Sequence, residues 1–273
     1  MVQFGMDATR VAVADTGNAQ GVARAFATAH QPVDSGELAA RLEAAGLDSA
    51  AASSLIEDAL DYGILWPQPP HPEQPETIIM LGESPLALDL RARLAADGYT
   101  VRIPLDEDNI FSYIHDLDGL FTVLGIDQLH CPIDCANALA GTPTTWLPIS
   151  LQDNRGIIGP LRVEGQGPCP LCIHLFRVDA DPQWSTIASQ LTSVRRQPEK
   201  LVIDAVAAQA QVVIRRLSKR PLPPGAPTSF PRPGQQWEVD VYGRHQQRTA
   251  IAHPRCPVCF GGKVNLATTA QSE

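Results

Sequence analysis

The stretch of sequence that decides the fold covers residues 77–103 and reads TIIMLGESPLALDLRARLAADGYTVRI. It begins with an apolar segment from Thr77 to Leu81, continues with an amphipathic segment from Leu86 to Ala96, and ends with a second apolar segment from Thr100 to Ile103. These patterns predict a strand, a helix and a strand, in that order. Such a crossover unit makes neighbouring strands parallel and covers the sheet with a helix.

The alternation of strands and helices continues along the chain. Leu120 to Leu124 and Thr145 to Ile149 are predicted to be buried strands, with a short helix from Asp134 to Ala140 between them. The segment from Leu201 to Leu217 is mostly apolar, which indicates a helix buried in the core or in a subunit contact. We therefore expect an α/β protein whose main domain is Rossmann-like, with a mostly parallel sheet.

The start of the chain has a different pattern, with two short strands followed by three helices. The predicted elements are the strands Val2 to Phe4 and Arg10 to Val13 and the helices Asn18 to Ala29, Ser35 to Ala45 and Ser49 to Tyr62. Asp34 and Asp48 stand where N-cap residues are expected. This order is typical of a small winged-helix-like module, which we assign to residues 1–66.

A proline-rich segment separates this module from the sheet domain. Residues 67–76 contain five prolines, which cannot donate backbone hydrogen bonds and favour an extended linker. The sheet domain is predicted to cover residues 77–273 and to end in a hairpin, Trp237 to Tyr242 with Arg248 to Ala252, that carries the last cysteine pair.

Composition and charge limit the classes of function. The formal net charge of −9 argues against general electrostatic binding to nucleic acid or to anionic lipid. The chain has no basic segment followed by an apolar stretch at its start, and no apolar run of about 18 residues. We expect a cytoplasmic protein without a membrane segment.

Four of the six cysteines form two C-x-x-C pairs, Cys169 with Cys172 and Cys256 with Cys259. Two such pairs can place four thiolates about 2.3 Å from one ion and complete a tetrahedral shell. The spacing predicts one zinc ion, which would be structural because four thiolates leave no open position for water. A redox pair and idle buried thiols are the alternatives, but a redox motif needs only one pair.

Other candidate residues carry weaker signals. Cys131 and Cys135 follow a predicted strand and could be nucleophilic, with His130 as a base, although a buried cysteine is commonly a small apolar side chain. Gly82 stands where a nucleotide-binding sheet carries its glycine-rich turn, but Glu83 in that turn would repel phosphate.

Two segments around the cysteines resemble a known family. Residues 159–184, GPLRVEGQGPCPLCIHLFRVDADPQW, and residues 253–259, HPRCPVC, resemble the zinc-binding segments of bacterial ubiquitin-activating-enzyme-like (ThiF-like) proteins. More narrowly, they resemble the cyclodehydratase partner proteins of YcaO-type enzymes. The opening segment from Val2 to Asp7, with the helices that follow, is similar to the leader-peptide recognition domain of that family.

The resemblance also implies residues for a nucleotide site. Adenylating members carry further glycines in the first turn, where this chain has Ser84 and Ala87, and an arginine after the acidic residue of the second strand, where residues 109–112 contain none. Gly82, Asp106 and Asp127 are the remaining candidates, Asp127 as a magnesium ligand. These differences argue against adenylation, and we expect a protein without ATP turnover.

The family resemblance and the residues together leave three functions open, in descending order of support. The first is capture of a leader or precursor peptide, as an added strand on the N-terminal hairpin against the helix Ser49 to Tyr62, and its presentation to a YcaO-type or other modifying enzyme. The second is ATP-dependent adenylation of a carboxylate. The third, a DNA-binding winged helix, is opposed by Glu57, Asp58 and Asp61 in the proposed recognition helix. The family resemblance further implies a homodimer.

Overall fold

The computed structural model describes residues 1–6, 12–67, 76–104, 113–114, 121–129, 132–190, 198–220, 222–224, 226 and 229–260. Some sequence-based assignments lie outside these residues. They are Asp106 and the segment 109–112, His130 with Cys131, and the first part of the predicted strand Arg10 to Val13. The chain separates into two compact units, Met1–Gln74 with Arg215–Phe230 and Pro75–Ile214 with Pro231–Glu273.

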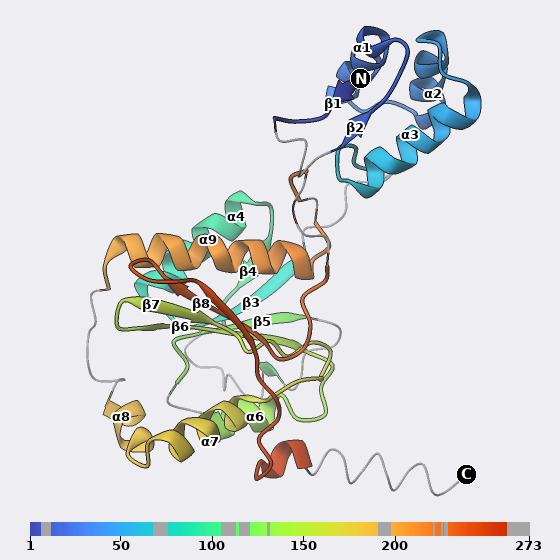
Figure 1. Ribbon diagram of the computed structural model, residues 1–273. Coiled ribbons are helices and arrows are strands. Elements are labelled where there is room, and N and C mark those ends of the chain that lie inside the picture. The colour runs from blue at the N-terminus through green and yellow to red at the C-terminus, as the bar shows by residue number, and fades with distance from the viewer. Residues whose placement is uncertain are drawn as a thin grey trace, which may run out of the picture. The chain divides into compact units, whose positions relative to one another are not determined.

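The first unit contains the predicted hairpin and three helices (Figure 1). Its elements are β1 (Val2–Gln3), β2 (Val13–Ala14), α1 (Ala19–Ala27), the 3-10 turn η1 (Thr28–His30), α2 (Ser35–Ala44) and α3 (Ser49–Asp61). The carboxylate of Asp34 accepts a hydrogen bond from Gly36 N (2.8 Å), and that of Asp48 accepts one from Ala51 N (2.7 Å). Both predicted N-caps are thereby confirmed, and each satisfies a backbone donor that the helix leaves unpaired.

A small apolar core holds this unit together. Phe4 meets Phe26 edge to face, with ring centroids 4.8 Å apart, which joins the hairpin to α1. The fully or largely buried members of the core are Val2, Val22, Ala25, Leu38, Leu42, Ala45, Ala52 and Ile56. They come from the hairpin and from all three helices, so the module has a core of its own.

The second unit is built on a seven-stranded sheet with the order β4-β3-β5-β6-β7-β8-β9. The strands are β3 (Thr77–Leu81), β4 (Thr100–Arg102), β5 (Thr122–Ile126), β6 (Thr145–Gln152), β7 (Arg155–Ile158), β8 (Gln235–Asp240) and β9 (Gln246–Thr249). The first four in spatial order are parallel to one another, and β7, β8 and β9 extend the sheet in antiparallel fashion. The predicted Rossmann-like α/β fold is confirmed, and β7, which joins the two halves, was not predicted.

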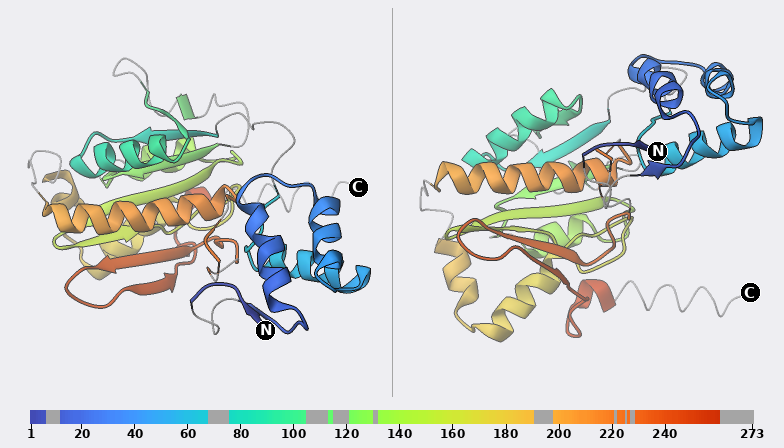
Figure 2. Two further views of the ribbon diagram at one scale, coloured as in Figure 1. Left: turned by 90° about the horizontal axis from the view of Figure 1, so that it is seen from above. Right: turned by 45° about the horizontal axis from the view of Figure 1, so that its top comes forward.

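Helices cover both faces of this sheet. They are α4 (Pro85–Ala96), α6 (Pro132–Ala138), α7 (Pro170–Ala180), α8 (Trp184–Gln190) and α9 (Lys200–Leu217). Figures 1 and 2 show α4 and α9 on one face and α6 and α7 on the other. Within the described residues, no helix is long and apolar enough to cross a membrane.

Packing against the chain's own sheet explains the apolar character of α9. Its buried side chains up to the unit boundary are Val202, Ile203, Val206, Ala207, Ala210, Val213 and Ile214. A Cβ added to Gly156 of β7 would lie 2.1 Å from Val206 Cγ2, so the helix rests directly on a strand backbone at this glycine. The helix therefore belongs to the core, the first of its two predicted locations.

This contact predicts that Gly156→Ala lowers the free energy of unfolding by about 1–3 kcal/mol, because the added methyl group overpacks the interface with Val206. Urea denaturation followed by circular dichroism measures the change. In a Val206→Ala background, the same Gly156→Ala change should lower the free energy of unfolding by less than it does in the wild type, because the smaller side chain leaves room for the added methyl group. Gly17→Ala is the control, since a Cβ there meets no atom within 4 Å. Equal stability of Gly156→Ala and the wild type would contradict the packing argument.

Candidate metal centre

Four cysteine side chains from two distant parts of the chain come together on the face of the sheet that α6 and α7 cover. Cys169 is the N-cap of α7 and Cys172 lies in its first turn, with Cys172 N donating to Cys169 O at 3.0 Å. Pro170 occupies the first turn of α7, where its missing N–H costs nothing. The predicted tight turn at the first pair is therefore the start of a helix that the sequence analysis did not foresee.

The second pair lies beyond β9, with Cys256 directly before a short helical turn, residues 257–260, and Cys259 within it. Cys256 N donates to His253 O, and Phe260 N donates to Cys256 O, both at 3.0 Å. Cys256 is fully buried and Cys259 is partly exposed. Each pair thus sits on a helical turn that aims both sulfurs toward the other pair.

The sulfur geometry matches a tetrahedral site. Cys169 Sγ lies 3.7 Å from Cys172 Sγ and 3.5 Å from Cys256 Sγ, and Cys172 Sγ lies 3.4 Å from Cys259 Sγ. All four sulfurs lie within 4.8 Å of one another. Zinc bound by four thiolates at about 2.3 Å separates the sulfurs by about 3.8 Å, whereas a disulfide requires about 2.05 Å. The donor set therefore fits a closed metal shell better than a redox pair.

The four sulfurs are close enough to form hydrogen bonds with one another, and a bound cation would take the place of the shared protons. Hydrogen bonding with Cys172 raises the pKa of the Cys169 thiol, and hydrogen bonding with Cys169 and Cys172 lowers the pKa of Cys259 to about 2. The short distances between the sulfurs therefore let the four side chains share protons by hydrogen bonding. A divalent cation stabilises all four thiolates, and its binding releases the remaining protons.

A second, polar connection runs beside the sulfurs. His253 Nε2 lies 2.9 Å from Asp179 Oδ2, and Arg255 N donates to His253 Nδ1 at 3.1 Å, which assigns the imidazole proton to Nε2. The Arg255 guanidinium also pairs with Asp179, and Phe176 meets His253 edge to face at 4.5 Å. Hydrogen bonds from His253 and Arg255 lower the pKa of Asp179. The histidine of the HPRC segment therefore orients the second cysteine pair against α7, a role that the sequence analysis did not assign.

The candidate nucleotide residues lie at the carboxyl edge of the parallel strands. Gly82 directly follows β3 with φ +115°, and an added Cβ would lie 2.4 Å from Ile126 O of the neighbouring strand β5. Asp127 directly follows β5, and its Oδ1 accepts a hydrogen bond from Leu151 N at 3.0 Å. Ser84 Oγ caps α4 by accepting from Ala87 N at 3.4 Å. Each residue thus has a structural function in the turn, while Asp106 lies outside the described residues.

Cys135 has the environment of an apolar side chain. It is 1% exposed and belongs to a core cluster that contains Ile79 and Leu139. This burial fits the simpler of the two sequence-based interpretations, whereas Cys131 and His130 lie outside the described residues.

Solved structures with the same fold were found, although no family model and no curated protein matches the sequence. The heterocyclase TruD aligns with a TM-score of 0.52 and 18% identity over 83% of this chain and 36% of its own. A heterocyclase in complex with substrate and cofactor aligns with a TM-score of 0.54, 16% identity and coverage of 83% and 34%. This chain therefore spans about a third of those heterocyclase chains.

A second group of similar structures matches almost end to end. Escherichia coli MccB with ATP aligns with a TM-score of 0.53 and 13% identity over 88% of this chain and 90% of that chain. MccB with MccA gives a TM-score of 0.53, 12% identity and the same coverage. At these identities the likeness establishes the fold and not the activity. It confirms, at that level, the resemblance to ThiF-like proteins that the two cysteine segments indicated.

The geometry predicts that Cys172→Ser and Cys259→Ser each reduce bound zinc from one ion per chain to nearly none. Loss of the metal should lower Tm by about 10 °C or more, because metal-binding free energy contributes to folding. Elemental analysis and thermal unfolding measure the two effects. Acidification should release the ion as protons compete for the thiolates.

Cys135→Ala is the matched control, because this buried cysteine lies outside the cluster and should keep one zinc per chain. Full zinc content in both ligand variants would exclude the four-thiolate site.

Proposed function

We propose that this chain captures a leader or precursor peptide with its N-terminal module and presents it to a partner modifying enzyme of the YcaO type. In this proposal the zinc ion is structural and stabilises the sheet domain. The fold shared with the heterocyclases and with MccB supports a role in the maturation of ribosomally made peptides.

The single observation that carries the proposal is the open backbone edge of the hairpin. Phe4 N donates to Ala12 O at 3.0 Å, and Gln3 stands opposite Val13 in the register. Antiparallel pairs alternate between hydrogen-bonded and non-hydrogen-bonded, so the backbone groups of Gln3 and Val13 point away from the hairpin. An extended peptide can pair with such an edge as a further strand.

Apolar side chains on the surface of the same unit offer contacts for peptide side chains. Val13 is 43% exposed, Tyr62 is 54% exposed and Trp66 is 40% exposed, and Leu60 of α3 is similarly open. The core of the module is complete without these four side chains. Exposed aromatic and aliphatic groups that the fold does not require are available for contacts with a peptide.

Charge favours a peptide over DNA at this surface. Residues 1–66 contain nine acidic residues and three arginines without a lysine. Glu57, Asp58 and Asp61 are exposed on α3. Phosphate groups would be repelled, whereas basic residues of a leader peptide would be attracted.

The proposal predicts that Gln3→Pro or Val13→Pro weakens the binding of a leader peptide about tenfold or more. Proline removes the outward N–H at the edge that the peptide uses, without removing a hydrogen bond inside the hairpin. Fluorescence anisotropy with a panel of labelled leader peptides from heterocyclised precursors measures the affinity. The variant that loses binding identifies the edge.

The experiment uses the whole chain, because Arg215–Phe230 clusters with the N-terminal unit and would be lost on excision. Gln3→Thr and Val13→Thr are the matched controls, since they change the side chain and keep the N–H. Unchanged affinity in both proline variants would exclude strand addition. Absence of binding across the panel would count against peptide capture itself.

A second candidate function is adenylation of a carboxylate. It is favoured by the end-to-end match with MccB, whose structure was solved with ATP, and by the proximity of Gly82 and the residue before Asp127 on neighbouring strands. Two residues of the first turn oppose adenylation: the Ser84 side chain is used to cap α4, and the anionic Glu83 would repel phosphate.

A homodimer remains a proposal that rests on the family resemblance alone. The apolar face of α9 does not supply a separate argument for it, because that face packs on its own sheet.

Adenylation predicts magnesium-dependent exchange of pyrophosphate into ATP, reduced at least about a hundredfold by Asp127→Asn. Asparagine can still accept the hydrogen bond from Leu151 N, so the fold is kept while a charged metal ligand is lost. A carboxylate substrate is supplied in the assay. No exchange in the zinc-loaded wild type would leave peptide capture as the proposed function.

A further inference from the structure

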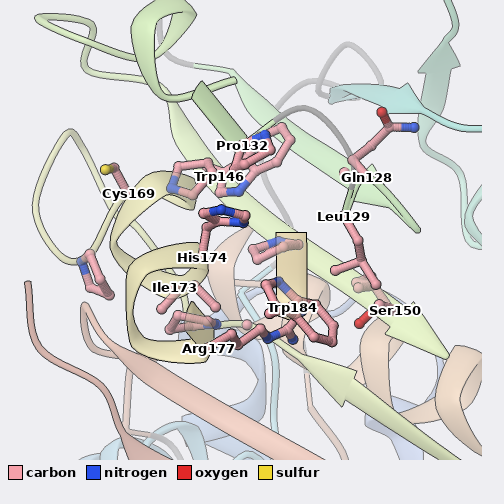
Figure 3. A pocket seen from close by; sticks show the side chains of 17 residues that line it. Gln128, Leu129, Pro132, Trp146, Ser150, Cys169, Ile173, His174, Arg177 and Trp184 are labelled. Carbon is pink, nitrogen blue, oxygen red and sulfur yellow. The ribbon is translucent and has the colours of Figure 1, made fainter. Parts of the chain in front are cut away.

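A pocket of about 50 Å³ lies between α7, the start of α8 and the facing strands β5 and β6 (Figure 3). Much of its wall is formed by the rings of Trp146, Trp184 and several prolines. Neither Gly82 nor Asp127 lines it. Gln128, the residue after Asp127, does line it, so the pocket adjoins the loop after β5, and it belongs wholly to the sheet unit.

Trp146, His174 and Arg177 are among the nitrogen-bearing side chains that line this apolar pocket. Trp146 is 2% exposed, and its Nε1–H has no hydrogen-bond partner among the described residues. His174 Nδ1 is likewise buried without a partner in the described part of the chain. Arg177, one turn further along α7, completes the set (Figure 3). A buried N–H without an acceptor is costly, so such a group in a pocket indicates a ligand that accepts.

The surrounding residues hold these groups in place. A Cβ on Gly125 would lie 2.3 Å from Trp146 Cη2, so only glycine lets the indole lie across β5. Ser185 Oγ lies 3.3 Å from His174 Nε2. When the hydroxyl donates to Nε2, the imidazole proton sits on Nδ1, which then becomes a donor. The Arg177 guanidinium stacks 4.7 Å from the centroid of Trp184.

The charge of Arg177 is not balanced by a neighbouring acid. Within the described residues it forms no ion pair, unlike Arg93, Arg155 and Arg255. Burial lowers its pKa, which reports the cost of desolvating the cation. An anion in the pocket would remove that cost and accept hydrogen bonds from the other two groups.

We propose that this pocket binds a small monocarboxylate, with Arg177 as the cation and with Trp146 Nε1 and His174 Nδ1 as further donors. One permanent cation matches one negative charge, whereas the second charge of phosphate would be left uncompensated among indole and proline rings. The cavity volume of about 50 Å³ also restricts the bound group to a small one. This inference does not depend on peptide capture by the N-terminal unit.

Fluorine NMR of the zinc-loaded whole chain with trifluoroacetate tests the proposal, with trifluoroacetamide as the neutral isostere. We expect line broadening of trifluoroacetate only. Arg177→Met should weaken binding at least about tenfold, because a charge-assisted hydrogen bond is lost while the side-chain stem stays over Trp184. Arg91→Met, at an exposed arginine of α4, should leave binding unchanged.

Trp146→Phe provides an independent variant should Arg177→Met fail to keep its zinc and its unfolding temperature. It removes the unpaired Nε1–H, and binding should again weaken. Competition by N-acetylglycine but not by N-acetylglycinamide would assign the pocket to a peptide C-terminal carboxylate. Competition by acetate but not by N-acetylglycine would assign it to a free small acid.

Four results would overturn the proposal. They are no broadening at millimolar trifluoroacetate, equal broadening of trifluoroacetamide, unchanged binding in both correctly folded variants, and competition by inorganic phosphate as strong as that by acetate. Failure of leader peptides to bind would leave this test unaffected, because its readout concerns the sheet unit alone.

Discussion

The convergence of four cysteine sulfurs is the constraint on which the sheet unit depends. Cys169 and Cys256 are 87 residues apart in sequence, and their sulfurs are 3.5 Å apart. The segment that carries Cys256 follows the last strand, so the sulfurs and the contact of His253 with Asp179 fix it against α7. A metal ion held by all four thiolates closes a long loop, which restricts the unfolded chain and stabilises the folded one.

Helix α7 links this constraint to the chemistry of the pocket. Cys169 is its N-cap, Cys172 lies in its first turn, and the next turn carries His174 and Arg177. On its other side Asp179 holds His253. A helix that is fixed at its start by a metal can keep a buried cation facing an apolar pocket, because the helix cannot rotate to expose the arginine to water. The candidate metal centre and the proposed carboxylate site therefore share one supporting element.

The two candidate binding regions differ in how completely their polar groups are satisfied. At the carboxyl edge of the parallel strands, Asp127 binds Leu151 N and Ser84 caps α4, so the polar groups already have partners inside the fold. The backbone groups of Gln3 and Val13 point outward from the hairpin. Backbone groups that point outward favour strand addition, whereas a satisfied turn has less to offer a phosphate group. This difference is the physical reason to rank peptide capture above adenylation.

Much of the local structure could be predicted from the sequence, because it depends on neighbours in the chain. The N-caps Asp34 and Asp48, the strand Thr77–Leu81 and the helix that follows it are where periodicity and capping predicted them. Cysteine spacing likewise predicted the four residues that the fold brings together. The helix from Pro170 was missed because its first turn was interpreted only as a metal-binding turn, although proline after a capping position is a signal for a helix start.

The sequence by itself determined the helices of the N-terminal unit, the strands and helices of the parallel half of the sheet, and which cysteines can share an ion, since hydrogen bonding within a turn and apolar periodicity are local properties. Only the tertiary structure decided the antiparallel extension through β7, the place of Asp179 beside His253 and the pocket formed where Trp146 crosses Gly125. These features depend on contacts between residues far apart in sequence, and close packing of particular side chains selects them.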